Sequence, residues 1–507
     1  MKPHTISAQQ KIGFFIKNLR EERGLTQALF AKELGTSQSA VARMEAGGQN
    51  FSTQELLKIS KILNHKRFSI SESLDFEVRG GKKLSGEITT NYSKNGSVVL
   101  LCASLLNKNK TTLHGISRIE EVYRLIEVME SLGVSVRWVG QNSLEILPPR
   151  QLAIRALNRE AASNIRASLM LIGPLVHREC AFHLPHAGGC KMGNRTIAAH
   201  RYGLEKLGVN VATQEEYYDI EAKKLKAAEI VMYEAGDTAA NNILMAAALI
   251  PGTTTIRFAP PNYQVQELCF FLESMGIKIE GIGTTNLVVH GIKEFDKPLE
   301  YHNSEDPIES MMFISVAATT GSKLTIKRSP VDFLLVELLK LEHMGLKFSV
   351  SKKYKSYNGR TDLVDITVFP SRLHALADKI HALPYPGINS DNLPFFVPIA
   401  TQAKGTTLIH DWMWENRAVY FTELGRLGAQ VTLADPHRVF ITGKTELKAG
   451  QVVCPPALRP AMIILIAMLA AKGTSILRNV YSINRGYEEI ASRLNSIGAD
   501  IRVLEGI

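Results

Sequence analysis

A short pattern recurs six times in this chain of 507 residues: an apolar helical segment ends at a glycine, and a strand-forming segment follows. The six copies are Met129–Val134, Leu204–Val209, Leu272–Ile277, Leu341–Leu346, Leu424–Ala429 and Leu494–Ala499. Glycine suits the position after the last helical residue because, without a Cβ, it adopts the left-handed backbone at little cost. Successive glycines lie 68 to 83 residues apart, which is too far for a solenoid repeat. We therefore expect a small α/β unit used six times.

A second strand signal precedes most copies and supports the α/β interpretation. These segments are Thr111–Leu113, Gly252–Thr254, Gly321–Lys323, Gly405–Thr407 and Gly473–Ser475. Three units per domain would give two similar domains, and ligands commonly bind in the cleft between such domains. The repeat predicts the class of fold, and the chemistry has to come from the loops.

Composition restricts the class of protein. Hydrophobic residues make up 45% of the chain and charged residues 21%, as in globular proteins. The longest apolar run, Ala461–Ala471, is shorter than the ~20 residues that span a bilayer, and Met1–His4 leads into no signal-peptide core. Five cysteines without a Cys-x-x-Cys pair argue against a disulfide framework or a cysteine zinc site. We expect a cytoplasmic protein with no membrane partner.

The net charge of +10 predicts anionic partners. Residues 1–75 hold 11 Lys/Arg against 7 Asp/Glu, so this short segment carries +4 of the total. The remaining +6 is spread over residues 76–507. This distribution favours two different anionic partners, one for each part of the chain.

The first 65 residues have the spacing of short helices. Thr26 is placed to cap a helix over 27–34, which Gly35 ends, and Ser37 is placed to cap a second helix over 38–45. Two short helices joined by a glycine turn form the helix-turn-helix pattern. Residues 8–65 resemble the Cro/C1-type (XRE) helix-turn-helix family, through Arg23–Gln27, Phe30–Ala31, Leu34–Gly35 and Ser37–Glu45.

This resemblance implies binding to double-stranded DNA. The side chains expected to contact it are those of Gln27, Ser37, Gln38, Ser39 and Arg43. One such domain binds weakly alone, so we expect a homodimer that reads two half-sites. The alternative is a small helical bundle used for protein contact.

A glycine-rich loop over residues 188–195 contains Cys190 among basic residues. Nearby cations lower the pKa of a thiol and make it reactive, and glycines allow a loop to hinge. We predict a functional role for Cys190. The other cysteines are expected to be structural: Cys102, Cys180, Cys269 and Cys454.

Separate basic residues stand at loop-like positions in the repeated units. They are Lys94, Arg166, Arg195, Arg417, Arg459 and Arg485. Taken singly, each would be a solvated surface cation, but equivalent loops of repeated units can converge on one cleft. A convergent set suits a small, multiply charged anion such as a phosphorylated carboxylic acid. Asp391 is a candidate general base in another loop.

Residues 76–507 resemble the UDP-N-acetylglucosamine 1-carboxyvinyltransferase family of enolpyruvyl transferases. The matching segments include Phe76–Gly80, Lys94–Asn95, Arg166–Ser168, Gly188–Cys190, Glu415–Arg417 and Arg485–Glu488. The resemblance implies a two-domain α/β enolpyruvyl transferase fold of six repeated units, of the inside-out α/β barrel type, preceded by the all-α helix-turn-helix domain. It implies these boundaries: helix-turn-helix 8–65, linker 66–75, first transferase domain 94–303, and second transferase domain 76–93 plus 304–507.

The same resemblance implies roles for the site residues. Cys190 would protonate the methylene carbon of phosphoenolpyruvate, and Asp391 would take the proton from the 3′-hydroxyl of the UDP-sugar. Asn95 would position that sugar. Lys94, Arg195 and Arg485 would hold the phosphate and carboxylate of the donor, helped by Arg166, Arg417 and Arg459. No metal and no cofactor would be needed.

Several positions depart from the pattern of this family. Thr196 and Ala198 stand where the family has Pro-Val-Asp, whose carboxylate helps to hold the uracil. Glu234, Gly236 and Asp237 stand in a segment that is basic in the family beside the diphosphate, and Ala457 replaces an aspartate. Three interpretations therefore stay open: this transferase with a DNA-binding domain, a transcriptional regulator that senses a cell-wall metabolite, and enolpyruvyl transfer to another acceptor.

Overall fold

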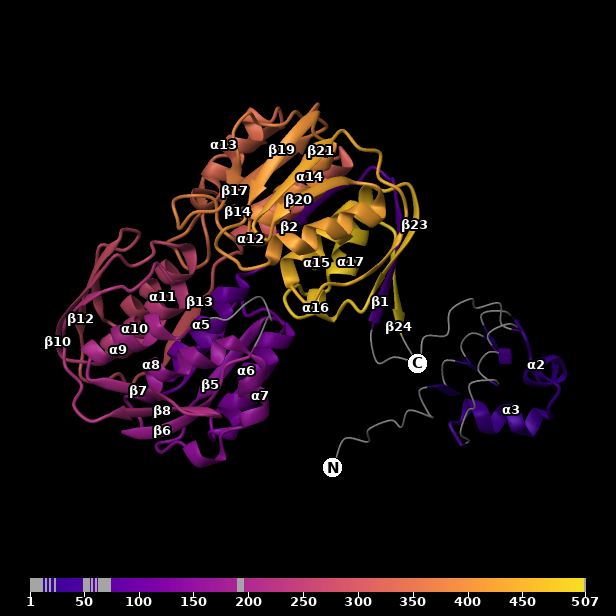
Figure 1. The fold of residues 1–507 in the computed structure, drawn as a ribbon. Helices are drawn as coiled ribbons and strands as arrows, with labels where there is room; N and C mark the ends of the chain where they lie inside the picture. The colour runs from indigo at the N-terminus through magenta and orange to yellow at the C-terminus, as the bar shows by residue number, and fades with distance from the viewer. Residues whose placement is uncertain are drawn as a thin grey trace. The chain divides into compact units, whose positions relative to one another are not determined.

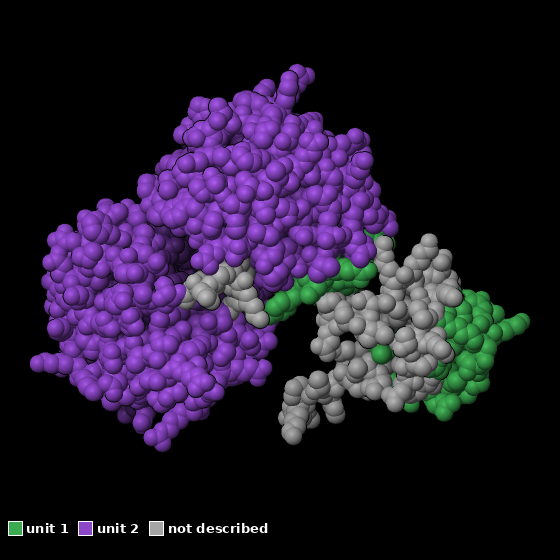
Figure 2. Space-filling view, viewed as in Figure 1, with its two compact units in different colours: residues 1–77, 478–481, 502–507 green, residues 78–477, 482–501 purple. Residues whose placement is uncertain are grey.

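The computed structural model describes residues 12–13, 16–17, 20–21, 24–48, 55, 58–59, 62, 74–188 and 196–505. The chain forms two compact units (Figure 2). Unit 1 comprises residues 1–77, 478–481 and 502–507, and unit 2 comprises residues 78–477 and 482–501. Each unit is described separately.

Unit 2 has two lobes (Figure 1). The first lobe, residues 94–302, contains the helices α5 (Lys94–Ser104), α6 (Glu120–Ser131), α7 (Arg159–Asn164), α8 (Ile172–Leu175), α9 (Ala198–Lys206), α10 (Asp237–Ala248) and α11 (Tyr263–Ser274), and the 3₁₀ helices η1 (Ile154–Ala156) and η2 (Arg166–Leu171). Its strands are β3 (Thr111–His114), β4 (Ser135–Trp138), β5 (Ser143–Leu147), β6 (Ala181–Pro185), β7 (Val209–Thr213), β8 (Tyr217–Ala222), β9 (Glu229–Val231), β10 (Gly252–Arg257), β11 (Lys278–Glu280), β12 (Asn286–Gly291) and β13 (Leu299–His302).

The second lobe consists of residues after 303 together with β2 from the start of the unit. Its helices are α12 (Pro307–Thr320), α13 (Leu335–His343), α14 (Phe396–Gln402), α15 (Leu458–Ala470), α16 (Tyr481–Asn484) and α17 (Ile490–Ser496), with the 3₁₀ helices η3 (Val331–Phe333), η4 (Leu393–Phe395) and η5 (Arg417–Leu427). Its strands are β2 (Ser85–Thr89), β14 (Lys323–Pro330), β15 (Lys347–Val350), β16 (Tyr354–Lys355), β17 (Asp362–Phe369), β18 (Ile380–His381), β19 (Gly405–His410), β20 (Gln430–Asp435), β21 (Arg438–Gly443), β22 (Gln451–Val453) and β23 (Gly473–Arg478). The exact residues at which the two transferase domains begin and end remain a prediction from the sequence.

The described strands form six sheets, one for each repeat of the pattern in the sequence. In the first lobe the strand orders are β13-β3-β5-β4, β6-β8-β7 and β11-β12-β10-β9. The others are β15-β17-β14-β2, with β16 paired to β17, then β18-β19-β21-β20, and β22-β23-β1-β24, where β1 is Leu74–Gly80 and β24 is Ile501–Glu505. These sheets confirm the prediction of six α/β units.

The most apolar helices lie inside the lobes, and the sheets lie outside them. Every residue of α12 is buried, and α15 is buried from Arg459 to Leu469. A helix that is hydrophobic on all sides must be covered on all sides, and α12, α14 and α15 pack against one another. In the first lobe α10 packs in the same way against α8, α9 and α11. This is the inside-out arrangement that the resemblance implies.

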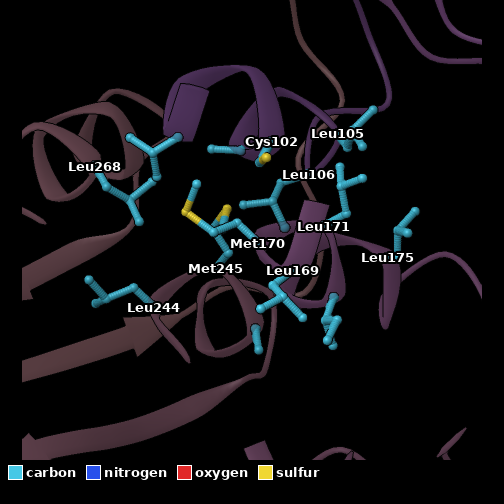
Figure 3. Close-up of a cluster of buried hydrophobic side chains, with 14 of the residues drawn as sticks. Cys102, Leu105, Leu106, Leu169, Met170, Leu171, Leu175, Leu244, Met245 and Leu268 are labelled. Atoms are coloured by element: carbon cyan, nitrogen blue, oxygen red, sulfur yellow. The ribbon is translucent and has the colours of Figure 1, made fainter. Parts of the chain in front are cut away.

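A cluster of Leu, Met and Cys side chains fills the first lobe (Figure 3). Cys102 of α5 lies fully buried there, and burial raises the pKa of its thiol far above the ordinary value. Cys269 and Cys454 are also buried. These three cysteines are placed as structural residues, whereas Cys180 is exposed at the start of β6.

The glycines of the six repeats occupy the predicted position. Gly133, Gly208, Gly276, Gly345, Gly428 and Gly498 all have left-handed backbone, with φ between 82° and 99°. A strand follows each of them: β4, β7, β11, β15, β20 and β24 respectively. The segment before Gly428 differs from the prediction, because it is the 3₁₀ helix η5.

Contacts from the turn after β16 join the two lobes of unit 2. Asn358 donates to Glu267 of α11 at 3.2 Å, and Arg360 pairs with Glu273 of the same helix. Burial raises the pKa of Glu267 to about 7, although hydrogen bonds from Ser304 and Tyr301 oppose the shift. The second lobe is therefore anchored to one face of α11.

Unit 1 contains the helices α2 (Gln27–Leu34) and α3 (Gln38–Glu45), as predicted. The hydroxyls of Thr26 and Ser37 accept hydrogen bonds from the first turns of these helices, and Gly35 ends α2 with φ 72°. A small core holds the described residues together: Ile16, Phe30, Ala31, Leu34, Val41, Met44 and Ile59. The buried Arg20 guanidinium donates to Glu45 at 2.5 and 3.1 Å, which ties the end of α3 to the first helical segment.

The repeat glycines allow a matched test of the backbone argument. A Cβ on Gly208 would lie 2.2 Å from the carbonyl oxygen of Lys224, whereas one on Gly276 would meet nothing within 4 Å. We expect Gly276→Ala to cost ~1–2 kcal/mol through left-handed strain alone. Gly208→Ala should cost ~1–3 kcal/mol more because the bend after β8, which holds Lys224, has to move. Urea-induced unfolding followed by circular dichroism measures both, and equal losses would contradict the assigned clash.

Candidate active site

A cleft of about 660 Å³ is lined by residues of both lobes of unit 2. Its lining includes the predicted site residues Lys94, Asn95, Arg166, Asp391, Arg417, Arg459 and Arg485. Figure 2 shows the surface of unit 2 hollowed where the lobes meet. Of the predicted transferase site residues, Cys190 and Arg195 lie outside the described residues. The structure therefore brings together every predicted transferase residue that it describes.

Asp391 lies between two arginines. Its carboxylate accepts a hydrogen bond from Arg459 at 3.1 Å and lies 3.9 Å from Arg417. Burial alone would raise the pKa of Asp391, but the charges of Arg459 and Arg417 hold it below the ordinary value. The carboxylate is therefore ionised at neutral pH and able to accept a proton.

Arg417 is fixed in place by a buried ion pair. It is 1% exposed, and its guanidinium donates to both oxygens of Asp411, at 2.5 and 2.8 Å. It also donates to the carbonyl oxygen of Ser390 at 2.6 Å, which holds the loop that carries Asp391. Asp411 thus balances the charge of Arg417, while Arg417 holds the backbone next to Asp391.

Arg459 begins α15 and is almost fully buried. It donates to Tyr487 at 2.6 Å as well as to Asp391. Burial alone would lower the pKa of Arg459, but Tyr487, Asp391 and Asp306 raise it above the ordinary value. Burial raises the pKa of Asp306 to about 6 against the charge of Arg459. This arginine is thus a permanent cation inside the cleft.

Lys94 stands at the first position of α5 and pairs with Glu121 of α6. Burial alone would raise the pKa of Glu121, but the charges of Lys94, Arg485 and Arg459 lower it. Lys94 also donates to the side-chain oxygen of Asn95 at 3.3 Å. Lys94 thus contacts this carboxylate, and the charges of Arg459 and Arg485 act on it as well.

The amide of Asn95 donates to the hydroxyl of Tyr263 at 2.8 Å. Tyr263 is buried, and burial raises its pKa well above the ordinary value. Its ring packs edge-on against Phe333 of the second lobe. Asn95 is therefore held at the floor of the cleft.

The lining of the cleft also contains Arg166 and the carboxylates of Glu234 and Asp237. Arg166 donates to the carbonyl oxygen of Thr196 at 3.2 Å and lies near Tyr218 and Glu234. Burial lowers the pKa of Arg166, although Tyr218 and Glu234 oppose this. The structure thus places Arg166 among the residues that depart from the family pattern.

Asp237, the first residue of α10, also lines the cleft. Its carboxylate accepts hydrogen bonds from Asn262, at 2.8 Å, and from Gln264. Burial raises the pKa of Asp237 to about 6, against these hydrogen bonds. Ala457 is buried beneath the start of α15, and Ala198 begins α9.

The described lining of the cleft is balanced in charge. The cations are Lys94, Arg166, Arg417, Arg459 and Arg485. The carboxylates are Glu121, Glu234, Asp237, Asp391 and Glu415. Arg459 and Arg417 lie close to Asp391, Lys94 pairs with Glu121, and Glu234 and Asp237 belong to the same lining.

Comparison with known proteins identifies the family. Residues 78–494 match the family model described as EPSP synthase (3-phosphoshikimate 1-carboxyvinyltransferase). The chain belongs to the EPSP synthase family. This is a family of transferases, so the chain is an enzyme of the transferase class. Residues 16–69 match a helix-turn-helix model.

Curated members of the EPSP synthase family include UDP-N-acetylglucosamine 1-carboxyvinyltransferases that resemble this chain. The enzyme of Borrelia garinii subsp. bavariensis is 34% identical over 426 residues, which is 84% of this chain and 98% of that protein. The enzyme of Bacteroides fragilis is 35% identical over 435 residues, or 84% and 99%. These relatives thus match most of this chain and almost all of their own length.

Solved structures confirm the predicted fold. The enolpyruvyl transferase NikO from Streptomyces tendae has a TM-score of 0.73 at 23% identity, covering 86% of this chain and all of that chain. EPSP synthase from Acinetobacter baumannii has a TM-score of 0.68 at 17% identity, covering 85% and all of that chain. No helix among the described residues is long and apolar enough to cross a membrane.

In unit 1, the residues predicted to contact DNA differ in their exposure and in their hydrogen bonds. Gln38, Ser39 and Arg43 are exposed on α3. Ser37 is exposed but occupied, since its hydroxyl caps α3. Gln27 is half-buried and donates to Glu45 at 2.8 Å, so it also supports the helical core.

Sequence reasoning missed several residues that shape the cleft of this EPSP synthase family member. Glu121, Asp306 and Tyr487 hold Lys94 or Arg459 in place, and Asp411 fixes Arg417. Only Asp306 carried a signal, because Asp before Pro307 marks the start of a helix. That signal predicts a cap and gives no indication of a cleft.

The raised pKa of Asp237 predicts a stability change with a definite sign. A raised pKa means that the folded state favours the protonated carboxyl, so this contribution to stability is lost as the pH rises through about 6. Asp237→Asn keeps an oxygen for Asn262 and Gln264 and removes the charge. The melting temperature of the variant, relative to the wild type, should therefore rise between about pH 5 and about pH 7.5.

Asp435→Asn is the control for this test. Asp435 is a surface carboxylate paired with Arg438, and that hydrogen bond lowers its pKa. Its replacement should show no such rise between the two pH values. Identical pH dependence in both variants would contradict the account of Asp237.

Proposed function

We propose that this enzyme transfers the enolpyruvyl group of phosphoenolpyruvate to the 3′-hydroxyl of UDP-N-acetylglucosamine in the cytoplasm. The observation that carries the proposal is the cluster of Lys94, Arg459 and Arg485 next to an ionised Asp391 in one cleft. The relatives that share 34–35% identity are named for this reaction. No cofactor is required in this scheme.

The donor is a small trianion with a phosphate and a carboxylate. Lys94, Arg459 and Arg485 supply preorganised positive charge in one cleft, where all three act electrostatically on the carboxylate of Glu121. A donor group entering the cleft competes with Glu121 and Asp391 for these cations. Arg195, which lies outside the described residues, would add a further cation.

The chemistry balances as an addition followed by an elimination. The acceptor hydroxyl attacks C2 of the donor, its proton passes to Asp391, and Cys190 supplies a proton to the methylene carbon. The C2–O bond to phosphate then breaks, the methyl carbon returns the proton that Cys190 supplied, and phosphate leaves with the proton that Asp391 accepted. Each proton that is gained is thus lost again, and no redox partner is involved.

Donor binding also tunes the general base. In the free enzyme Arg459 donates to Asp391 at 3.1 Å and keeps the pKa of that carboxyl low. When the anionic donor pairs with Arg459, it offsets the positive charge next to Asp391. The pKa of Asp391 then rises toward the range in which a carboxylate is an effective base. The enzyme would thereby couple donor occupancy to activation of the hydroxyl.

One observation favours an acceptor other than UDP-N-acetylglucosamine. Glu234 and Asp237 line the end of the cleft where the family pattern has a cation for the diphosphate. Carboxylates repel a diphosphate, so an acceptor with fewer negative charges is the alternative substrate. Enolpyruvyl transfer to such a nucleotide or sugar uses the same Asp391 and the same cation cluster.

The N-terminal domain supports double-stranded DNA as a second partner. Gln38, Ser39 and Arg43 are exposed together on α3, the helix that enters the major groove in helix-turn-helix proteins. A homodimer would place two copies of α3 on two half-sites. The alternative function, a regulator whose transferase part senses a cell-wall metabolite, uses the same two parts without turnover.

A phosphate-release assay tests the transferase. The wild type should release phosphate from phosphoenolpyruvate when UDP-N-acetylglucosamine is present, and Asp391→Asn should lower kcat ~10²–10⁴-fold because it lacks a proton acceptor. Cys190→Ala should be impaired in the same assay, whereas Cys180→Ala, at an exposed position outside the cleft, should keep wild-type activity.

A panel of acceptors separates the alternatives. Release with another nucleotide or sugar, but not with UDP-N-acetylglucosamine, would favour the second acceptor. If no acceptor supports release, the transferase proposal fails and the sensing function remains.

DNA binding is tested on the full chain by selection from a random duplex pool, followed by fluorescence anisotropy. Arg43→Ala should cost ~1–3 kcal/mol of discrimination between the selected site and random DNA, because a base-contacting side chain is lost. Lys32→Ala removes the same charge from α2 and should weaken both complexes alike. Failure to enrich any duplex would count against DNA as the partner.

A further inference from the structure

A cluster of two histidines and a glutamate lies in the first lobe of unit 2 and does not line the cleft. His114 ends β3, and Glu300 and His302 stand on β13. One ligand atom from each of the three side chains lies within 4.8 Å of the other two. Neither the family resemblance nor the proposed reaction assigns these residues a role.

Strand pairing fixes the cluster. β3 and β13 are parallel neighbours, and His114 is the register partner of His302. Residues two apart on a strand share a face, so Glu300 and His302 lie on the same face of β13. The imidazole rings of His114 and His302 are stacked with centroids 4.3 Å apart and planes inclined by 21°.

The third side chain completes the group. His114 Nε2 lies 2.7 Å from Glu300 Oε1, and His114 Nδ1 lies 2.8 Å from the hydroxyl of Ser143 on β5. Stacked rings bring two nitrogen donors side by side, and the carboxylate stands at their edge. These are the ligand types and the number of protein ligands found in open zinc sites.

We propose that His114, Glu300 and His302 form a binding site for a divalent transition-metal ion of the zinc class. Two imidazoles and one carboxylate select such ions over magnesium and calcium, which prefer oxygen ligands. Around one zinc ion, ligand atoms lie about 3.3 Å apart, so binding requires the stacked rings to turn about their side-chain torsions until both nitrogen lone pairs face the ion. Water would complete the coordination.

The surroundings of His114 suit a metal ligand. When Nε2 binds the ion, the ring proton resides on Nδ1 and is donated to Ser143 Oγ, which is already in place. Ser143 therefore orients the imidazole toward the ion.

The location gives the ion a structural consequence. Asn303, directly after His302, donates to the carbonyl oxygens of Ser93 and Gly115 at 2.9 Å, and it leads from the first lobe toward α12. The ring of Tyr357, from the second lobe, lies 5.8 Å from that of His302. An ion bound here would clamp β3 to β13 at the passage between the lobes.

The test uses the untagged full chain after removal of metals with EDTA. Isothermal titration with Zn²⁺ should show one ion per chain at this site, and Co²⁺ should give a visible spectrum without thiolate charge transfer, which excludes the cysteines. His302→Ala and Glu300→Gln should each weaken binding at least about tenfold, and Ser143→Ala about tenfold. Bound Zn²⁺ should also raise the melting temperature of the wild type more than that of these variants.

His290→Ala is the matched control. His290 Nε2 lies 3.1 Å from Glu280, and its Nδ1 lies 3.3 Å from the hydroxyl of Thr253, so it repeats the surroundings of His114 without a second imidazole. It should bind Zn²⁺ like the wild type. Because the side chain of Glu300 is 69% exposed, Glu300→Gln leaves folding intact.

Two results would overturn the proposal. One is the absence of stoichiometric Zn²⁺ binding by the wild-type chain. The other is binding that persists unchanged in both His302→Ala and Glu300→Gln. Neither result bears on phosphate release, so the site stands or falls separately from the transferase activity.

Discussion

The fold of unit 2 follows from helices that have no polar face. α12 and α15 are buried along almost their whole length, so they have to be enclosed, and the six sheets provide the enclosure. Helices at the centre leave their first turns, and the loops that precede them, at the ends of each lobe. Arg459 at the start of α15, Lys94 at the start of α5 and Asp237 at the start of α10 all reach the cleft in this way. The need to bury these helices thus determines where the charged residues of the cleft lie.

Within the cleft, most charged groups are held by partners before any substrate arrives. Asp411 holds Arg417, Glu121 holds Lys94, and Tyr487 holds Arg459. Such pairs avoid the large cost of burying an isolated charge, and they fix the direction of each side chain. A substrate anion therefore meets an arranged set of cations instead of flexible side chains, at the expense of competing with the resident carboxylates.

Much of this structure could be predicted from the sequence, and there is a physical reason why the rest could not. The repeat glycines and the caps Thr26 and Ser37 act through neighbouring backbone atoms, and the positions predicted for them are confirmed. The cations of the cleft could be predicted because a family resemblance groups residues that lie far apart in the chain. Glu121 and Asp411 could not, because each gains its role from a partner that only the folded chain brings near. The cluster at His114 likewise depends on a strand register that no local pattern encodes.

The equal numbers of cations and carboxylates in the described lining bear on how fast partners arrive. The described lining by itself projects little field beyond a Debye length, about 8 Å at physiological ionic strength, so it steers small anions weakly. Substrate capture would then depend on diffusion and on contacts made inside, with rates nearly independent of salt. A basic helical domain that meets DNA releases counterions and responds steeply to salt. The ionic strength of the cell would thus set the occupancy of one partner while leaving the other almost unchanged.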